Sequence, residues 1–188
     1  MTYLEALTNT RHKQPDTMVA GISSMILQIR KENIKQSLGG PDTIGHRQEY
    51  VATVDGVMYY DDARAENENA TWFTFQNIVK PVIWVAGGET GGNDFKELKR
   101  MAKNKVKALV CINGAGGTLR KAFQKDVKDI YDAPNLEEAV ATASLIAQDG
   151  DIVLFSPACK SGDDEETYIE RGKIFTESVR RMEHERNQ

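Results

Sequence analysis

The sequence has few cysteines, no long apolar run and no excess of basic residues. Its two cysteines, Cys111 and Cys159, lie within or just after apolar stretches, a pattern that predicts buried thiols and not a disulfide framework. Apolar runs are far shorter than the roughly 20 residues that a transmembrane helix needs. A net charge of −4 and a pI near 5.5 give no general attraction to nucleic acid or anionic lipid. We therefore expect neither a nucleic acid nor a membrane as partner.

Several short motifs are also missing. The chain contains no Walker G-x-x-x-x-G-K-[ST] sequence, and NGAGGT at residues 113–118 does not match G-x-G-x-x-G, so no triphosphate-gripping loop is predicted. The carboxylates come in short clusters without a recognisable ligand spacing, and no metal site is predicted. The first residues lack the basic start and apolar stretch of a signal peptide, which leads us to expect a cytoplasmic location.

What is present is an ordinary globular composition. The 188 residues are 28% charged and 40% apolar, outside the range of disordered chains. A chain of this length can bury one substantial core and carry a short extension, but two full domains would need more residues.

Apolar periodicity predicts a helix over 18–38, which ends at the Gly-Gly-Pro of 39–41. Residues 49–60 are two short β-rich runs joined by Asp55-Gly56, a pair typical of a two-residue antiparallel hairpin. After the hairpin, predicted strands and predicted helices alternate along the chain. Strands are expected at 82–88, 107–112, 128–133 and 151–158, and helices at 67–79, 94–103, 118–124, 136–148 and 165–182.

All of these later strands except 128–133 are continuous and rich in Val, Ile and Leu, as expected where helices cover both faces of a parallel sheet. The predicted fold class is α/β: a Rossmann-like, doubly wound, mostly parallel six-stranded sheet with an antiparallel N-terminal hairpin. Asn135 and Glu138 form a capping box at the start of the 136–148 helix. The charged tail 180–188 is expected to be a solvated, fraying end.

Ligands of such folds bind beyond the carboxyl ends of the strands, where helix N-termini offer unpaired N–H groups. Candidate segments are 59–73, 86–94, 113–118 and 156–164. The two glycine-rich segments, 86–94 and 113–118, are better explained as tight strand-to-helix turns. The acidic segment 59–73, YYDDARAENENATWF, places carboxylates and an arginine at the point where such a fold binds its ligand.

At these points the sequence resembles a known family. The segments that carry the resemblance are GHRQEYVATVDGVMYYDDARAEN, VIWVAGGETGGNDF, VKALVCI, NLEEAVATASLIA, GDIVLFSPACKS and YIERGKIFTESVR. In this order and spacing they are similar to the C-terminal domain of the Mur ligases, above all the branch that adds D-glutamate to UDP-N-acetylmuramoyl-L-alanine. The resemblance covers about residues 10–182. It implies that 1–40 are a helical remnant of the central ATPase domain and that 41–188 are the C-terminal, Rossmann-like glutamate-ligand domain.

The resemblance implies an ATP- and Mg²⁺-dependent reaction in peptidoglycan synthesis. An acyl phosphate forms on the alanine carboxylate, and the amine of D-glutamate then attacks it. The implied partners are the UDP-linked muramoyl precursor, D-glutamate and an ATPase module in the same or another chain. Because that P-loop module is not found in this sequence, we expect no cofactor to bind tightly to this chain alone.

The resemblance also implies site residues. His46, Arg47 and Asp62 match nucleotide-binding positions: Arg47 would contact a terminal phosphate and Asp62 would lie near the ribose.

Three further residues, Ser161, Tyr168 and Asn67, match positions that hold the incoming D-glutamate. Arg64 stands where the family has a lysine and is the candidate catalytic residue, although it lacks lysine's compact ammonium.

The chain departs from the family at several of these points. Glu66 replaces a threonine hydroxyl with an acceptor-only carboxylate, and Gly91 replaces a second lysine. Other changes are Ala63, Gly162, the acids 164–166, and Lys13 and Asp16 in place of two asparagines. Acids beside an anion site should oppose the binding of phosphate or glutamate.

Simpler interpretations of the same residues stay open. The acids of 163–166 can favour a helix N-terminus, His46 can be a structural turn residue, and 59–67 can be a loop with an Asx-type cap. Two functions remain: a glutamate-ligand domain that is inactive alone, or a retired domain kept as a binding or scaffold unit. A third, a stand-alone nucleotide binder, rests only on the glycine turns.

Overall fold

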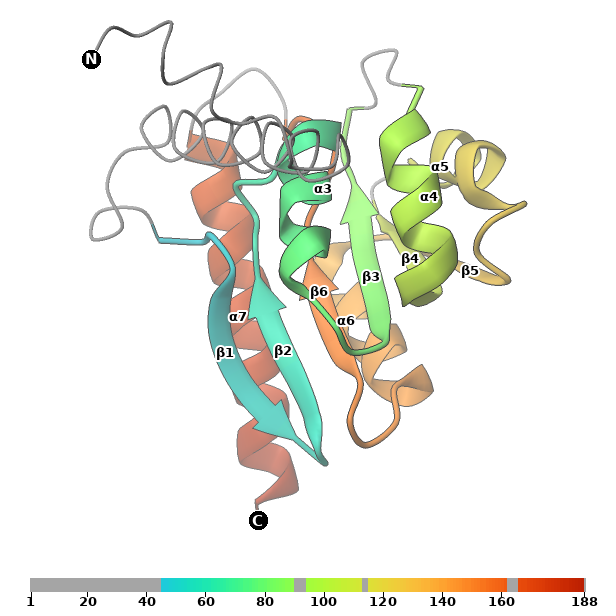
Figure 1. The fold of residues 1–188 in the computed structure, drawn as a ribbon. Coiled ribbons are helices and arrows are strands. Elements are labelled where there is room, and N and C mark those ends of the chain that lie inside the picture. Colours follow the sequence, from blue (N-terminus) through green and yellow to red (C-terminus); the bar gives the residue numbers. More distant parts are fainter. Residues whose placement is uncertain (1–44, 90–93, 113–114, 162–165, 188) are drawn as a thin grey trace, which may run out of the picture. The chain divides into compact units, whose positions relative to one another are not determined.

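The computed structural model describes residues 45–89, 94–112, 115–161 and 166–187 (Figure 1). Residues 45–188 form a unit of their own. The helix predicted over 18–38 lies outside the described residues, as do Lys13, Asp16, Gly91 and Gly162, so the sequence-based expectations for them stay predictions.

A six-stranded sheet forms the centre of this unit. Its strands are β1 (Glu49–Val54), β2 (Val57–Asp61), β3 (Val82–Gly87), β4 (Val106–Ile112), β5 (Asp129–Ala133) and β6 (Ile152–Phe155). They lie in the order β1-β2-β6-β3-β4-β5. Only the β1–β2 pair is antiparallel, and all other pairs are parallel. The predicted fold class is confirmed, including the N-terminal hairpin.

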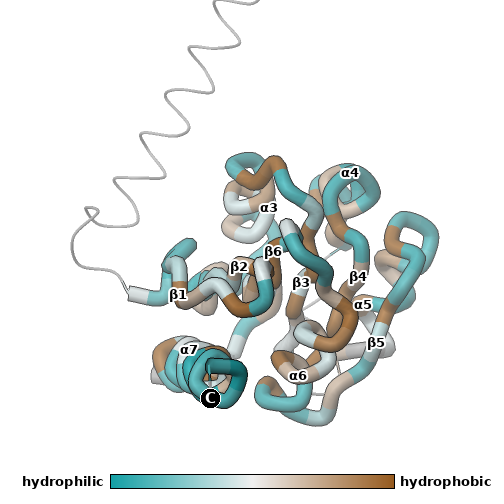
Figure 2. The backbone as a smooth tube through the Cα atoms, turned by 90° about the horizontal axis from the view of Figure 1, so that it is seen from below, coloured by the Kyte–Doolittle hydropathy of each residue, from teal (hydrophilic) through white to brown (hydrophobic). Residues whose placement is uncertain are grey.

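Helices cover both faces of the sheet (Figure 2). They are α3 (Glu68–Asn77), α4 (Lys96–Lys105), α5 (Gly116–Phe123), α6 (Leu136–Ile146) and α7 (Glu166–Arg186). One core cluster joins the sheet to α3, α4 and α5, and the other joins it to α6 and α7. This two-sided cover explains why β3 and β6 are buried along their whole length, whereas edge strand β5 is mostly exposed.

The hairpin turn between β1 and β2 has the backbone that its sequence predicts. Asp55 and Gly56 have φ values of 50° and 77°, as a two-residue turn with both central residues left-handed requires. A Cβ at Gly56 would lie 2.0 Å from Asp149 Oδ1. Glycine is therefore needed there for space as well as for conformation.

Trp84 on β3 joins the core to the loop after β6. Its ring packs edge-on against Phe75 of α3 and Phe123 of α5, with centroid separations of 5.2 and 5.1 Å. Its indole Nε1–H donates to the carbonyl of Ser156 at 2.7 Å. A buried aromatic residue thus fixes the backbone at the carboxyl end of β6.

The expected fraying of the tail is wrong. Helix α7 continues to Arg186, because Met182 packs against the core that includes Val179 and because Arg186 forms an ion pair with Asp55 of the hairpin turn. The sequence analysis missed this packing because most residues of the tail are charged. No helix among the described residues is long and apolar enough to cross a membrane.

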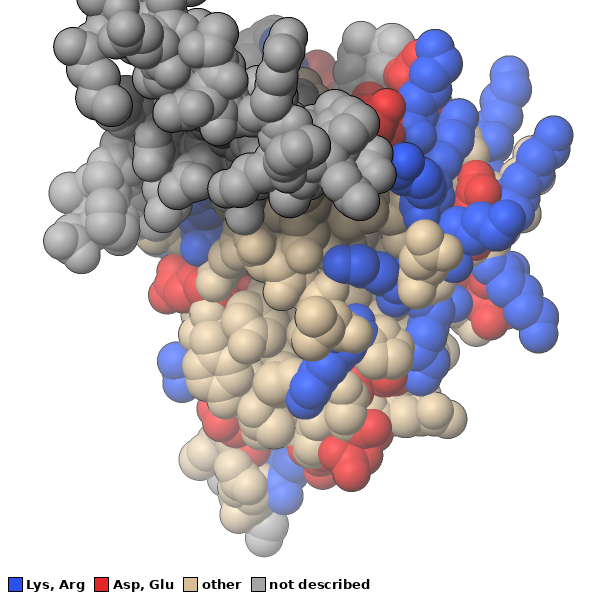
Figure 3. All heavy atoms as spheres, viewed as in Figure 1, with Lys and Arg blue, Asp and Glu red and all other residues tan. Residues whose placement is uncertain are grey.

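Charge is unevenly distributed over the surface. Lys and Arg side chains gather over the α4 side in Figure 3. Helix α4 alone carries Lys96, Lys99, Arg100, Lys103 and Lys105. Lys105 binds the carbonyls of Phe75 and Ile78 at the end of α3, so part of this charge serves helix capping.

Removal of the Asn135 cap should destabilise the domain by about 1 kcal/mol. Asn135 Oδ1 accepts the amide N–H of Glu138 at 2.8 Å, so Asn135→Ala leaves a helix N–H without its partner. Urea unfolding checks the value. Asn135→Ser is the control, since a serine can still cap; equal losses for both variants would contradict the role given to the side chain.

Candidate functional site

A buried carboxylate lies at the carboxyl ends of β2 and β6. Asp62 is 1% exposed, and its Oδ2 accepts from the hydroxyls of Thr74 at 2.6 Å and Ser156 at 2.9 Å. Its Oδ1 accepts the backbone N–H of Gln48 at 3.3 Å. These partners come from α3, from the loop after β6 and from the loop before β1. One carboxylate therefore holds three segments of the site together.

Burial raises the pKa of Asp62 to about 6, although the bonds from Thr74 and Ser156 and the charge of Arg47 lower it. The resemblance predicts that Asp62 lies near an ATP ribose. In the structure its oxygens are occupied inside the protein, so contact with a ribose would need a rearrangement of this network. Its nucleotide role stays a prediction.

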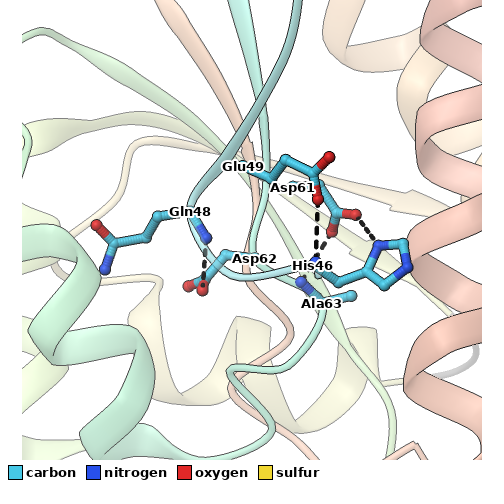
Figure 4. Close-up of polar contacts among 6 residues, drawn as sticks. All are labelled: His46, Gln48, Glu49, Asp61, Asp62 and Ala63. Carbon is cyan, nitrogen blue, oxygen red and sulfur yellow. Dashed lines mark hydrogen bonds and ion pairs between the residues drawn. The ribbon is translucent and has the colours of Figure 1, made fainter. Parts of the chain in front are cut away.

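The neighbouring Asp61 holds His46. Its Oδ2 lies 2.5 Å from His46 Nδ1, and the backbone N–H of His46 donates to Glu49 Oε2 at 3.1 Å (Figure 4). His46 has a φ of 63°, an uncommon conformation for a non-glycine residue. A Cβ at Gly172 on α7 would lie 2.1 Å from His46 Nδ1. Local contacts therefore account for the position of the ring, and its nucleotide role remains untested.

His46, Glu49 and Asp61 also bring three potential ligand atoms within 4.8 Å of one another, and imidazole and carboxylate are common metal ligands. The sequence analysis missed this group because Glu49 and Asp61 meet only through the β1–β2 pairing, in which they are opposite each other. Burial raises the pKa of Asp61, and the bond from His46 lowers it. In the structure the short contact pairs His46 Nδ1 with the Asp61 carboxylate.

Two arginines contribute positive charge to the same region. Burial lowers the pKa of Arg47, and the charge of Asp62 partly offsets this effect. The guanidinium carbon of Arg64 lies 5.6 Å from the ring centroid of Tyr168, a cation–π distance. The structure thus brings together the candidate catalytic residue and one candidate substrate residue. Arg64 N–H also donates to the carbonyl of His46 at 3.1 Å, which joins the two loops.

The other two candidate substrate residues have partners within the chain. Asn67 is the N-cap of α3, and its Oδ1 accepts the N–H of Ala70 at 2.9 Å, in agreement with the Asx-cap interpretation. Ser161 donates its backbone N–H to Glu66 Oε1 at 2.8 Å, and its hydroxyl contacts the same oxygen. Glu66, the residue in place of the family threonine, therefore occupies both donors of Ser161.

Arg171 of α7 is a site residue that the sequence analysis missed. It is 7% exposed, and its Nη2 donates to the carbonyl of Gly87 at 2.5 Å. Among the described residues, neither its Nε nor its Nη1 has a hydrogen-bond partner. Its helical periodicity could have predicted burial, but only the fold places it beside the turn after β3.

The glycine turn after β3 allows this approach. Gly87 and Gly88 have φ values of 143° and 139°, and a Cβ on Gly88 would lie 2.3 Å from the carbonyl oxygen of Lys160. The interpretation as a tight turn therefore fits these residues. Both cysteines are buried, as predicted, and burial raises the pKa of Cys111 to about 12 and that of Cys159 to about 11.

The fold and the cationic, hydroxyl-bearing rim at the carboxyl edge of the sheet place the chain among the doubly wound α/β domains, a class in which ligands bind at this edge. Comparison with known proteins gives the family. The sequence model of the family described as "Mur ligase, glutamate ligase domain" matches residues 46–159. The chain belongs to this family.

Curated relatives support the assignment. The chain is 35% identical to a UDP-N-acetylmuramoylalanine--D-glutamate ligase of Salinibacter ruber over 90% of its own length and 37% of the relative. A protein of the same name from Clostridioides difficile is 36% identical over 91% of this chain and 38% of the relative. The chain thus spans less than two fifths of the curated relatives that it matches.

Solved structures show the same fold at low sequence identity. The UDP-N-acetylmuramate-alanine ligase of Thermotoga maritima covers 80% of this chain with a TM-score of 0.50 and 14% identity, and 36% of that protein is matched. The E. coli protein FolC, solved in complex with ADP, covers 79% of this chain with a TM-score of 0.52 and 14% identity, and 34% of that protein is matched. These similarities concern the fold alone.

The stability of the domain should fall as the pH rises from about 4 to about 6. Asp62 has a folded pKa of about 6 against an ordinary value of 3.8, so the folded state binds the proton more tightly than the unfolded state. The stabilisation is complete below the unfolded pKa and is lost as the pH rises through the folded pKa, on the order of 3 kcal/mol. Asp61, whose pKa is also raised, acts in the same direction.

Carboxyl-carbon NMR titration measures the Asp62 pKa directly, and urea unfolding at pH 4.5 and 7.5 measures the slope. The exposed Asp94, whose pKa is lowered by Lys96, is the internal control and should titrate below 3.8. An Asp62 midpoint near 4 would contradict the buried network.

Gly172→Ala should displace His46 and lower the free energy of unfolding by roughly 1–3 kcal/mol, since the new methyl group would overlap the imidazole. Side-chain nitrogen NMR of His46 and urea unfolding report the two effects. Gly117→Ala is the matched control, because a Cβ there meets nothing within 4 Å and alanine favours the helix. Similar losses in both variants would argue against close packing of His46.

Proposed function

We propose that this chain is the glutamate-ligand domain of an ATP-dependent peptidoglycan-precursor amide ligase and has no ligase activity alone. Its reaction would be the addition of D-glutamate to UDP-N-acetylmuramoyl-L-alanine. The ATP and Mg²⁺ would be held mainly by an ATPase module, in the same or another chain. The observation that carries the proposal is the contact of Arg64 with Tyr168, in a chain 35% identical to a D-glutamate ligase over 90% of this chain.

The proposed ligase reaction requires hydrogen-bond donors and positive charge at this edge of the sheet. Negative charge builds up on the transferred phosphate and on the tetrahedral intermediate as the amine attacks, and preorganised cations and N–H groups stabilise such charge. In this proposal Arg47 faces a terminal phosphate and Arg64 faces the reacting carboxyl. Ser161, Tyr168 and Asn67 orient the amino acid, and His46 and Asp62 support the loop on the nucleotide side.

ATP would supply the phosphoryl group that activates the carboxylate. Among the described residues, Arg47 and Arg64 are the groups that suit a phosphate. The enclosed Asp62 carboxylate does not suit a ribose without rearrangement. Tight nucleotide binding by this chain alone is therefore not part of the proposal.

One contact favours a second candidate, a retired domain kept as a binding or scaffold unit. Glu66 fills both donors of Ser161 with a carboxylate of the chain itself. In such a domain D-glutamate would find no free donors there, and the loop would serve only to hold the fold together.

The isolated chain should show no turnover with ATP, Mg²⁺, D-glutamate and the UDP-linked precursor. The part of the Salinibacter ruber relative that lies outside the matched 37%, added in trans, should give D-glutamate-dependent phosphate release because it would supply an ATPase module. Phosphate release and amide formation, followed by mass spectrometry, are the readouts.

The same part of the relative without this chain is the control. The absence of turnover in trans, together with no saturable binding of D-glutamate or precursor in calorimetry, would overturn the ligase proposal and leave the scaffold interpretation. Turnover by the isolated chain would contradict both.

A further inference from the structure

Arg171 is a buried cation with unused donors. Among the residues that the structure describes, its hydrogen-bond partner is the carbonyl of Gly87, which accepts from Nη2, and the guanidinium carbon lies 5.3 Å from the ring centroid of Phe155. Nε and Nη1 have no partner among the described residues. Removing charged donors from water without partners is costly, so an anion bound at these donors would be favoured.

The loop that carries Ser161 lies beside this cation. Gly88 is close to both: a Cβ there would lie 2.3 Å from Lys160 O and 3.2 Å from Arg171 Nη1. Glu89 N–H also donates to the carbonyl of Lys160 at 2.9 Å. The turn after β3 therefore fixes the 160–161 segment near Arg171.

Glu66 provides the negative charge in this neighbourhood. Its Oε1 accepts both donors of Ser161, and its charge raises the pKa of Arg171, which burial lowers more strongly. The Glu66 carboxylate thus accepts from the hydroxyl and the N–H of Ser161 and interacts electrostatically with Arg171. Within the described part of the chain, Glu66 and Arg171 form no direct hydrogen bond, and Nε and Nη1 of the arginine have no partner there.

We propose that Ser161 and Arg171 form an oxyanion site for small carboxylates, and that the chain's own Glu66 occupies its Ser161 half until a free carboxylate displaces it. The proposal rests on the proposed function only in assigning Ser161 to the amino-acid ligand. A tethered carboxylate competes at an effective concentration on the order of millimolar or higher. Weak ligands would therefore not displace Glu66, whereas a ligand that also binds the Arg171 donors without a described partner would displace it.

Glu66→Ala tests this competition. The probes are glutarate, D-glutamate, L-glutamate and inorganic phosphate, and binding is followed through the amide signal of Ser161 and by calorimetry. The Glu66→Ala chain should bind glutarate at least tenfold more tightly than the unchanged chain. Glu66→Gln, which keeps an acceptor oxygen but loses the charge, should lie between them. Glu68→Ala removes one charge two residues along the chain, away from Ser161, and should leave binding unchanged.

Second-site variants test the two donors. Ser161→Ala and Arg171→Lys, each added to Glu66→Ala, should each reverse the gain, while circular dichroism verifies the fold. If Glu66→Ala binds no probe more tightly than the unchanged chain, or if neither second change reduces the gain, the proposal is wrong.

The outcome is separable from that of the ligase proposal, because no ATPase module or nucleotide is needed. Tight glutarate binding without preference for D- over L-glutamate would keep the oxyanion site and weaken the D-glutamate assignment. If no probe binds more tightly to the Glu66→Ala chain but turnover occurs in trans, the oxyanion site is contradicted and the ligase function is not.

Discussion

The arrangement of the site depends on the desolvated carboxylate of Asp62. Thr74, Ser156 and the backbone of Gln48 all donate to it, so α3, the loop after β6 and the loop that carries His46 and Arg47 are fixed by one group. These donors offset part of the cost of burying the carboxylate, and each donor would be costly to leave unpaired. The loop from 62 to 67 starts from this anchor, which is why its side chains have defined neighbours.

The second constraint is the balance of charge around that anchor. Glu66, the added acid, accepts hydrogen bonds from Ser161. Arg171 is buried, and two of its donors have no partner in the part of the chain that the structure describes. The sequence-based argument expected repulsion of anions in general. Occupation of specific donors is a different effect, since it can be reversed by moving one side chain, whereas a general excess of negative charge cannot.

Much of the fold could be predicted from the sequence because it follows from local patterns. Asp55-Gly56 specifies a turn, Asn135 caps a helix, and the apolar runs of β3, β4 and β6 indicate strands covered on both faces. The continuation of α7 to Arg186 could not be predicted, because its partner Asp55 is 131 residues away in the sequence. The site position of Arg171 could not be predicted for the same reason. Nor could the group that contains Glu49 and Asp61, since the β1–β2 pairing is what brings these two residues opposite each other.

The site also shows why matching positions do not imply matching chemistry. Asn67 and His46 stand at positions given a ligand role by resemblance, yet each has a local partner, the amide of Ala70 and the carboxylate of Asp61. A side chain can serve as a helix cap or an ion-pair partner and still face a ligand only if its remaining polar atoms point outward. Asn67 is exposed, and the hydrogen bond of its cap uses Oδ1 and not the side-chain amide nitrogen. The His46 ring, held between Asp61 and Gly172, has only Nε2 for a ligand.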